Sequence, residues 1–178
     1  MKGRIYKFTG LALVLYSLIY GLLTSIPDLP ILEQSIRNLF YHVSMWFAMV
    51  AMMGGSFGYA ISFLSKEDLN KDHRSVALAQ TGMLFATLGL LTGMIWAKYT
   101  WGAWWTNDPK LNGSAVTMLI YLAYFALRNA MDDGRKRARI SAVYNIFAFV
   151  MMIVFIGILP RMTDSLHPGN GGNPGFNS

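Results

Sequence analysis

The chain has 178 residues, of which 54% are hydrophobic and only 13% are charged. Because a soluble domain is typically about one quarter charged, this composition excludes an ordinary water-soluble globular protein. In so apolar a chain the net charge of +6 indicates membrane topology rather than nucleic-acid binding, and the lack of cysteine excludes disulfides, thiolate metal sites and a cysteine nucleophile.

The charged residues are clustered and leave five long uncharged intervals between them. One bilayer crossing needs about 20 apolar residues. The sequence therefore predicts an all-α integral membrane protein, a bundle of five transmembrane helices at 8–26, 39–65, 75–97, 111–127 and 140–160. These spans leave no room for a separate soluble domain, so residues 1–178 are expected to form a single membrane domain.

The first apolar interval resembles a signal peptide because Lys2, Arg4 and Lys7 precede it. It is longer than a typical signal-peptide core, and the segment 24–27 (Thr-Ser-Ile-Pro) is a poor cleavage site. We therefore expect a retained helix.

The distribution of lysine and arginine predicts the orientation of the spans. The amino-terminal tail and the second and fourth connections carry eleven of these residues, and the other connections carry four. By the positive-inside rule the amino terminus is cytoplasmic, and the segments 27–38, 98–110 and 161–178 lie outside. The stretch 168–175, rich in Gly, Pro and Asn, is expected to be an irregular outer loop.

All five tryptophans fall in the outer half of this topology. An aromatic belt at the membrane interface explains a single such residue, but belts normally occur at both interfaces. A platform for a large planar ligand explains the asymmetry better. Gly102, inside the tryptophan-rich segment, either lets the backbone approach a ligand or permits a turn. The five are Trp46, Trp96, Trp101, Trp104 and Trp105.

Two of the three histidines lie on the same outer side. His42 opens the second span and His167 lies in the last outer loop, whereas His73 sits in a basic cytoplasmic connection and is expected to be solvated. A single interfacial histidine is commonly a hydrogen-bonded spectator. Two of them flanking a tryptophan-rich segment favour axial ligation of haem iron. Zinc and calcium cages are poorly supported, because there is no cysteine and no outer acidic cluster.

Several other residues have a local explanation. Asp108 followed by Pro109 is typical of a helix amino terminus. Lys110 is a candidate partner for a ligand carboxylate or an interfacial lysine. The pairs at 54 and 58 and at 89 and 93 are Gly-x-x-x-Gly motifs of close helix packing. No Walker A motif is present, and we expect no enzymatic activity of the chain itself.

The outer tryptophan-rich segment is expected to span 98–112. Its part 101–112, Trp-Gly-Ala-Trp-Trp-Thr-Asn-Asp-Pro-Lys-Leu-Asn, resembles the WWD signature of the haem-handling proteins of cytochrome c biogenesis. With Tyr-His-Val at 41–43 and Ser-Leu-His at 165–167, the chain is most similar to the CcmC family. The resemblance covers essentially the whole chain. The family commonly has an aromatic residue where Asn107 stands, and Arg-Leu-Thr where this chain has Lys-Leu-Asn at 110–112.

The resemblance implies that the protein lies in the bacterial inner membrane and transiently holds b-type haem at the periplasmic face. It then passes the haem to the chaperone CcmE, with CcmD and the CcmA–CcmB transporter as associates. It also implies six spans, with the last beyond residue 178. The implied axial ligands are His42 and His167, and the other expected haem contacts are Trp46, Trp101, Gly102, Trp104, Trp105 and Asp108.

Three alternatives stay open. The related CcsA proteins attach haem directly, but they generally have longer chains. A b-type cytochrome subunit usually places its histidines inside the bilayer on facing helices. A transporter or structural subunit would bury ionisable residues near the midplane, and spans two to five contain no Asp, Glu, Lys or Arg.

Overall fold

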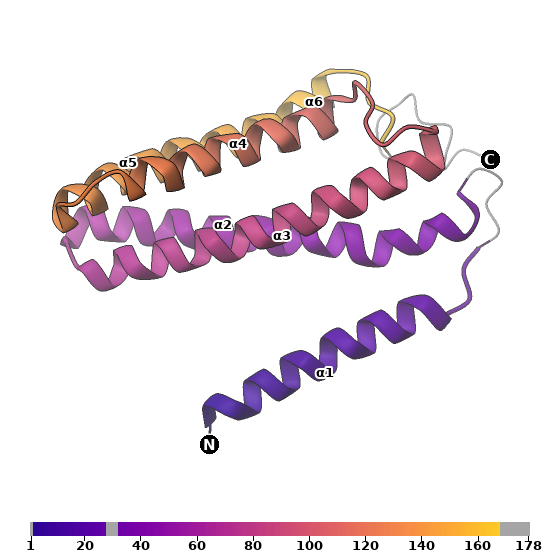
Figure 1. Ribbon diagram of the computed structural model, residues 1–178, viewed down its shortest axis with the longest axis horizontal. Coiled ribbons are helices and arrows are strands. Elements are labelled where there is room, and N and C mark those ends of the chain that lie inside the picture. Colours follow the sequence, from indigo (N-terminus) through magenta and orange to yellow (C-terminus); the bar gives the residue numbers. More distant parts are fainter. Residues whose placement is uncertain (1, 28–31, 168–178) are drawn as a thin grey trace.

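The computed structural model describes residues 2–27 and 32–167, and this part of the chain is helical and contains no strand. In chain order its elements are α1 (Lys2–Leu23), the 3₁₀ helix η1 (Glu33–Arg37), α2 (Asn38–Lys66), α3 (Leu69–Trp101), α4 (Pro109–Asn129), α5 (Gly134–Met152), the π-helix η2 (Ile153–Ile158) and α6 (Leu159–Met162) (Figure 1).

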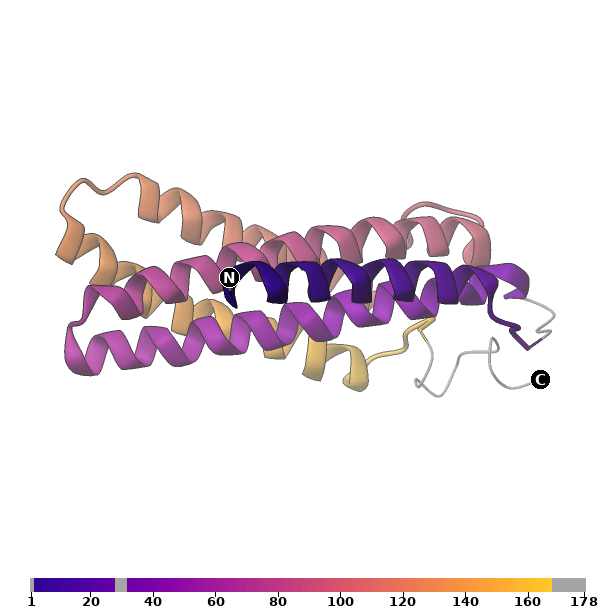
Figure 2. The same ribbon diagram turned by 90° about the horizontal axis from the view of Figure 1, so that it is seen from below.

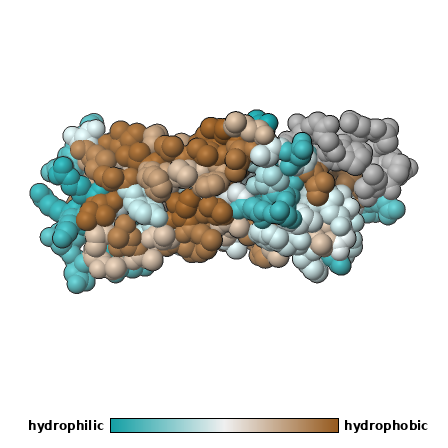
Figure 3. Space-filling view, turned by 90° about the horizontal axis from the view of Figure 1, so that it is seen from above, coloured by the Kyte–Doolittle hydropathy of each residue, from teal (hydrophilic) through white to brown (hydrophobic). Residues whose placement is uncertain are grey.

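Five helical stretches are long and apolar enough to cross a membrane, so the five predicted spans are confirmed by length and composition. On the face shown in Figure 3 an apolar belt crosses the middle of the bundle, and hydrophilic residues lie toward both ends. The helices extend further than predicted. α3 continues through Trp101, so the predicted connection at 98–110 is reduced to 102–108.

The bundle has two different ends. We call the end where α2 and α4 begin and α3 stops the tryptophan end, and the opposite end, with the turns at 67–68 and 130–133, the basic end (Figure 1). The predicted cytoplasmic side corresponds to the basic end. The predicted loop at 168–175 lies outside the described residues.

A stripe of small residues on α3 lets α2 pack closely against it. Ala79, Gly82, Ala86 and Gly89 recur every three or four positions on one buried face. A Cβ added to Gly82 would lie 2.9 Å from the sulfur of Met53, so no larger residue fits there without a shift. The hairpin between the two helices closes at Glu67, which has a φ of 50°, and at Asp68, which caps α3 by accepting from the Asn70 N–H.

The basic end contains a buried ion pair that sequence reasoning missed. The guanidinium of Arg128 donates to both carboxylate oxygens of Asp72, at 2.8 and 2.6 Å, and both side chains are buried. Both residues fall outside the predicted spans 75–97 and 111–127, but they lie inside α3 and α4. The expectation that they lie outside the helices is therefore wrong.

A polar contact among three helices lies next along the bundle. The hydroxyls of Ser56 and Ser75 each donate to the other's backbone carbonyl, at 2.7 and 2.9 Å. The Asn145 amide donates to both hydroxyls, at 2.8 and 3.0 Å. Because all three side chains are buried, this contact holds α2, α3 and α5 in register.

Helix α1 stands apart from the bundle (Figures 1 and 2), and the hydrogen bonds that its described residues make to the bundle lie near the tryptophan end. There Arg37 donates to the carbonyls of Gly21 and Thr24, and the Tyr41 hydroxyl donates to the Leu18 carbonyl. Most side chains of α1 are exposed, as is consistent with a helix surrounded by lipid.

Candidate ligand-binding site

A cavity of about 560 Å³ opens at the tryptophan end, a size typical of small-molecule sites. Helices α2, α3 and α4, the π-helix η2 and the last described segment form its walls. Aliphatic side chains line much of it. The residues in its wall that carry aromatic rings or charge include His42, Trp46, Trp96, Trp101, Lys110, Arg161 and His167.

His42 lies in the second turn of α2, and its hydrogen bonds define its tautomer. Its Nδ1 lies 3.0 Å from the Gly89 carbonyl, which can only accept, so Nδ1 carries the proton. Its Nε2 lies 3.2 Å from Nε1 of Trp46, which can only donate, so Nε2 carries a lone pair. The two contacts agree on a neutral imidazole that is protonated at Nδ1.

Two glycines of α3 make the space for these rings. A Cβ on Gly93 would lie 2.7 Å from Cε1 of His42, and a Cβ on Gly89 would lie 3.0 Å from the Trp46 indole. His42 and Trp46 are four residues apart, as are the two glycines, so the antiparallel helices match them pair by pair. The Gly-x-x-x-Gly motif at 89 and 93 thus accommodates side chains of the site. At Gly58 a Cβ would meet nothing within 4 Å, so the close packing predicted there is wrong.

His167 comes from the segment after α6, and Asp108 holds it. Its Nδ1 lies 2.8 Å from Oδ1 of Asp108. Burial lowers the pKa of His167 below its usual value, more than the Asp108 carboxylate raises it. The imidazole is therefore neutral near pH 7, with its Nδ1–H donated to the carboxylate. No described residue hydrogen-bonds its Nε2, which is the atom left for a ligand.

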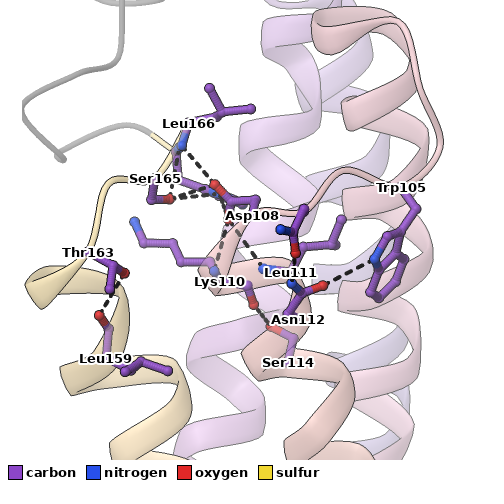
Figure 4. A network of polar contacts seen from close by, with 12 residues as sticks. Trp105, Asp108, Lys110, Leu111, Asn112, Ser114, Leu159, Thr163, Ser165 and Leu166 are labelled. Carbon is purple, nitrogen blue, oxygen red and sulfur yellow. Dashed lines mark hydrogen bonds and ion pairs between the residues drawn. The ribbon is translucent and has the colours of Figure 1, made fainter.

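Asp108 is buried and links two distant segments. Its Oδ1 accepts from the backbone of Lys110 and Leu111, which confirms the predicted cap of α4. Its Oδ2 accepts from the Ser165 hydroxyl at 2.8 Å and from the Leu166 N–H at 2.7 Å (Figure 4). Burial by itself raises the pKa of Asp108, but His167 and these hydrogen bonds outweigh it and hold the pKa below its ordinary value. Asp108 lies behind His167 and is not part of the cavity wall.

The tryptophan-rich segment divides into two parts. Trp101 lines the cavity and meets the His167 ring edge to face, with centroids 5.1 Å apart. Gly102 has a φ of +80° and ends α3, so it serves the turn, and no atom lies within 4 Å of a Cβ placed on it. Trp104 and Trp105 are 54% and 42% exposed and do not line the cavity.

The indole of Trp105 points toward α4 instead. Its N–H donates to Asn112 at 3.2 Å, on the other side of α4 from Ser165 (Figure 4). Asn112 in turn donates to Asn107 at 2.7 Å.

Sequence reasoning did not assign Trp96 and Arg161 to the site. Trp96 meets the His42 ring edge to face at 5.8 Å, and its buried Nε1 has no partner among the described residues. Arg161 follows the wider π-turns of η2, and Gly157 and Ile156 of that helix also line the cavity. The position of Trp96 close before the tryptophan-rich segment was a usable signal, but nothing local marked Arg161.

The donor set suits a flat iron porphyrin. Two neutral imidazoles and several flat rings share one mostly apolar cavity. Lys110 and Arg161 in its wall carry the positive charge that the porphyrin carboxylates need. The buried Trp96 N–H lacks an acceptor among the described residues. Within the same part of the chain no cluster of three His, Cys, Asp or Glu could hold a bare metal ion.

Comparison with known proteins identifies the family of the chain. The family model of CcmC, heme exporter protein C, matches residues 3–170. The chain belongs to the CcmC family. It is 26% identical to heme exporter protein C of Haemophilus influenzae over 165 residues, which cover 93% of this chain and 66% of that protein.

The CcsA proteins of cytochrome c biogenesis are also similar over part of the chain. The CcsA protein of Prochlorococcus marinus strain SARG is 35% identical over 99 residues, or 55% of this chain and 30% of that protein. In strain MIT 9515 of the same species the identity is 34% over 106 residues, or 59% of this chain and 32% of that protein. The chain thus matches about one third of the length of these CcsA relatives and just under two thirds of the Haemophilus protein.

Proposed function

We propose that the protein binds haem in the cavity, with His42 and His167 as axial ligands, and delivers it to the chaperone CcmE for cytochrome c maturation. The observation that carries this proposal is the pair of imidazoles in one cavity wall. In each of them the Nδ1–H group donates a hydrogen bond to an oxygen, which leaves Nε2 as the atom for iron. A metal-binding histidine usually has this arrangement.

The surroundings support the same ligand. Trp96 and Trp101 offer flat apolar surface to the macrocycle, and Lys110 and Arg161 offer positive charge to its carboxylates. The function we assign to the chain is therefore binding and delivery, with no bond-making chemistry of its own beyond metal ligation.

The location and partners belong to the same proposal. The excess of lysine and arginine at the other end of the bundle supports a tryptophan end at the periplasmic face of the bacterial inner membrane, where CcmE would receive the haem. CcmD and the CcmA–CcmB transporter are the proposed associates, and the apolar belt is the surface for lipid (Figure 3).

Absorption spectra of the purified protein, before and after dithionite, test the proposal. His42→Ala and His167→Ala should each lower haem occupancy and change the visible spectrum. His73→Ala is the matched control, because His73 lies at the basic end and is exposed. Unchanged spectra in both site variants would remove the axial-ligand assignment. A stoichiometric haem that stays bound and cycles in respiration would instead support a b-type electron-transfer subunit.

A further inference from the structure

The two imidazoles of the site are held differently. Nδ1 of His167 donates to a buried carboxylate, and no described residue hydrogen-bonds its Nε2. Nδ1 of His42 donates to a backbone carbonyl, and its Nε2 accepts the indole N–H of Trp46 at 3.2 Å. A carboxylate partner makes an imidazole a stronger electron donor than a neutral carbonyl does. The lone pair that iron needs is thus available on one histidine and engaged on the other.

We propose that Trp46 caps the iron-binding nitrogen of His42, which makes His42 the exchangeable ligand and His167 the retained one. This inference rests on the proposed haem function and adds an order of ligand exchange to it. Trp46 is a positioning residue here, because it acts through His42.

The cap is built into the helix pair. Trp46 lies one helical turn after His42, so their rings are neighbours on the same face of α2. The Trp46 indole lies against Gly89, whose carbonyl accepts from Nδ1 of the same histidine. One turn of α3 therefore holds both the imidazole and its cap, and the cap forms without any ligand.

The exchange step needs no other reactant. When haem binds, the hydrogen bond from the Trp46 indole N–H to Nε2 of His42 breaks, and the Nε2 lone pair forms the bond to iron. When haem leaves, the Fe–Nε2 bond breaks, the lone pair returns to Nε2, and the Trp46 N–H bonds to it again. No electron or proton is gained or lost. The recaptured hydrogen bond offsets part of the cost of breaking the iron bond and so favours release.

Trp46→Phe keeps an aromatic ring and removes the donor. Since one hydrogen bond contributes about 1 kcal/mol net, haem should bind the variant about fivefold more tightly and leave it correspondingly more slowly. The measurements are haem titration of the full chain in detergent and the rate of haem loss to excess apomyoglobin. Trp96→Phe is the matched control. Trp96 also packs edge to face on His42 and lines the cavity, but its N–H has no described partner, so its replacement should not tighten binding.

A readout on the haem-free protein separates this inference from the function on which it rests. In ¹⁵N-labelled protein the Trp46 indole proton should give a hydrogen-bonded signal, which His42→Ala shifts toward that of an unbonded indole. Gallium protoporphyrin, a diamagnetic analogue, should cause the same shift in the wild type.

The outcomes are distinct. Tighter binding by Trp46→Phe alone, with the indole shift, supports the cap. Unchanged or weaker binding by Trp46→Phe, in a protein whose spectrum still depends on His42, overturns the cap and leaves the proposed function intact. A wild type that binds neither haem nor gallium protoporphyrin overturns both.

Discussion

The two ends of the bundle treat polar groups in opposite ways. At the basic end Arg128 and Asp72 satisfy each other, and α3 and α4 are joined there by a bidentate ion pair. At the tryptophan end each histidine uses Nδ1 to hold its position. Nε2 of His167 has no hydrogen-bond partner among the described residues, and Nε2 of His42 accepts a hydrogen bond from the Trp46 indole. The difference separates stability from binding. Two buried charges that satisfy each other leave nothing for a ligand, whereas a ring nitrogen that is unbonded or holds one exchangeable hydrogen bond can still bind one.

The largest expected effect is on the free energy of unfolding, when the buried ion pair at the basic end is broken. Arg128→Met leaves Asp72 buried without a partner, and breaking such a pair costs about 3–5 kcal/mol of unfolding free energy. Unfolding in mixed micelles measures this loss. The matched control is Arg139→Met, whose pair with Glu67 is exposed and worth at most about 1 kcal/mol. Equal losses of unfolding free energy in the two variants would show that the buried pair stabilises the fold no more than the exposed one.

The next effect concerns the carboxylate behind His167. Asp108→Asn keeps a capping side chain but removes the charge that orients the imidazole, so haem affinity should fall about 10- to 100-fold. Haem titration measures the fall. Asp133 caps α5 through the same two backbone bonds and lies at the basic end, so Asp133→Asn should leave the affinity unchanged. A similar loss in both variants would trace the effect to capping.

A smaller effect on haem affinity is expected when the space beside His42 is filled. Gly93→Ala puts a methyl group against Cε1 of His42 and should displace the ring, lowering haem affinity about tenfold, since such overpacking costs on the order of 1–3 kcal/mol. Gly58→Ala on α2 meets no atom within 4 Å and should bind haem normally. If Gly93→Ala bound haem as the wild type does, the ring would not depend on that glycine.

The smallest expected effect concerns the outward tryptophans. Trp104→Ala combined with Trp105→Ala removes exposed rings outside the cavity wall, so the haem affinity of the isolated protein should change by less than about twofold, well under the effect of a lost buried contact. Haem titration measures the change. Trp101→Ala is the comparison, because Trp101 lines the cavity and packs on His167. A larger loss in the double variant would extend the haem contact over the outer surface.

Much of the fold was predictable because it depends on local composition. Five uncharged intervals predicted five spans, and Asp108 before Pro109 predicted the cap that begins α4. Local composition gave the wrong location for Arg128. Its position falls in a predicted connection between spans, but its side chain is buried in the structure. Its partner lies 56 residues away, and no local pattern reveals such a pairing.

The candidate site was predictable in its residue types but not in its roles. Aromatic and histidine residues gather on one side of the topology, and four of the eight predicted contact residues line one cavity: His42, Trp46, Trp101 and His167. The cytoplasmic placement of the amino terminus and the haem contacts themselves stay predictions. That Trp46 bonds to His42, and that Trp104 and Trp105 face outward, followed only from the tertiary arrangement.

The sequence by itself determined that this is a helical membrane protein with its histidines and tryptophans gathered mostly at one end, because hydrophobic burial in lipid depends on composition along the chain. Only the tertiary structure decided what each of these residues does. Hydrogen bonds act over about 3 Å, so the difference between His42 and His167 depends on which helix or loop brings Gly89, Trp46 or Asp108 within that distance.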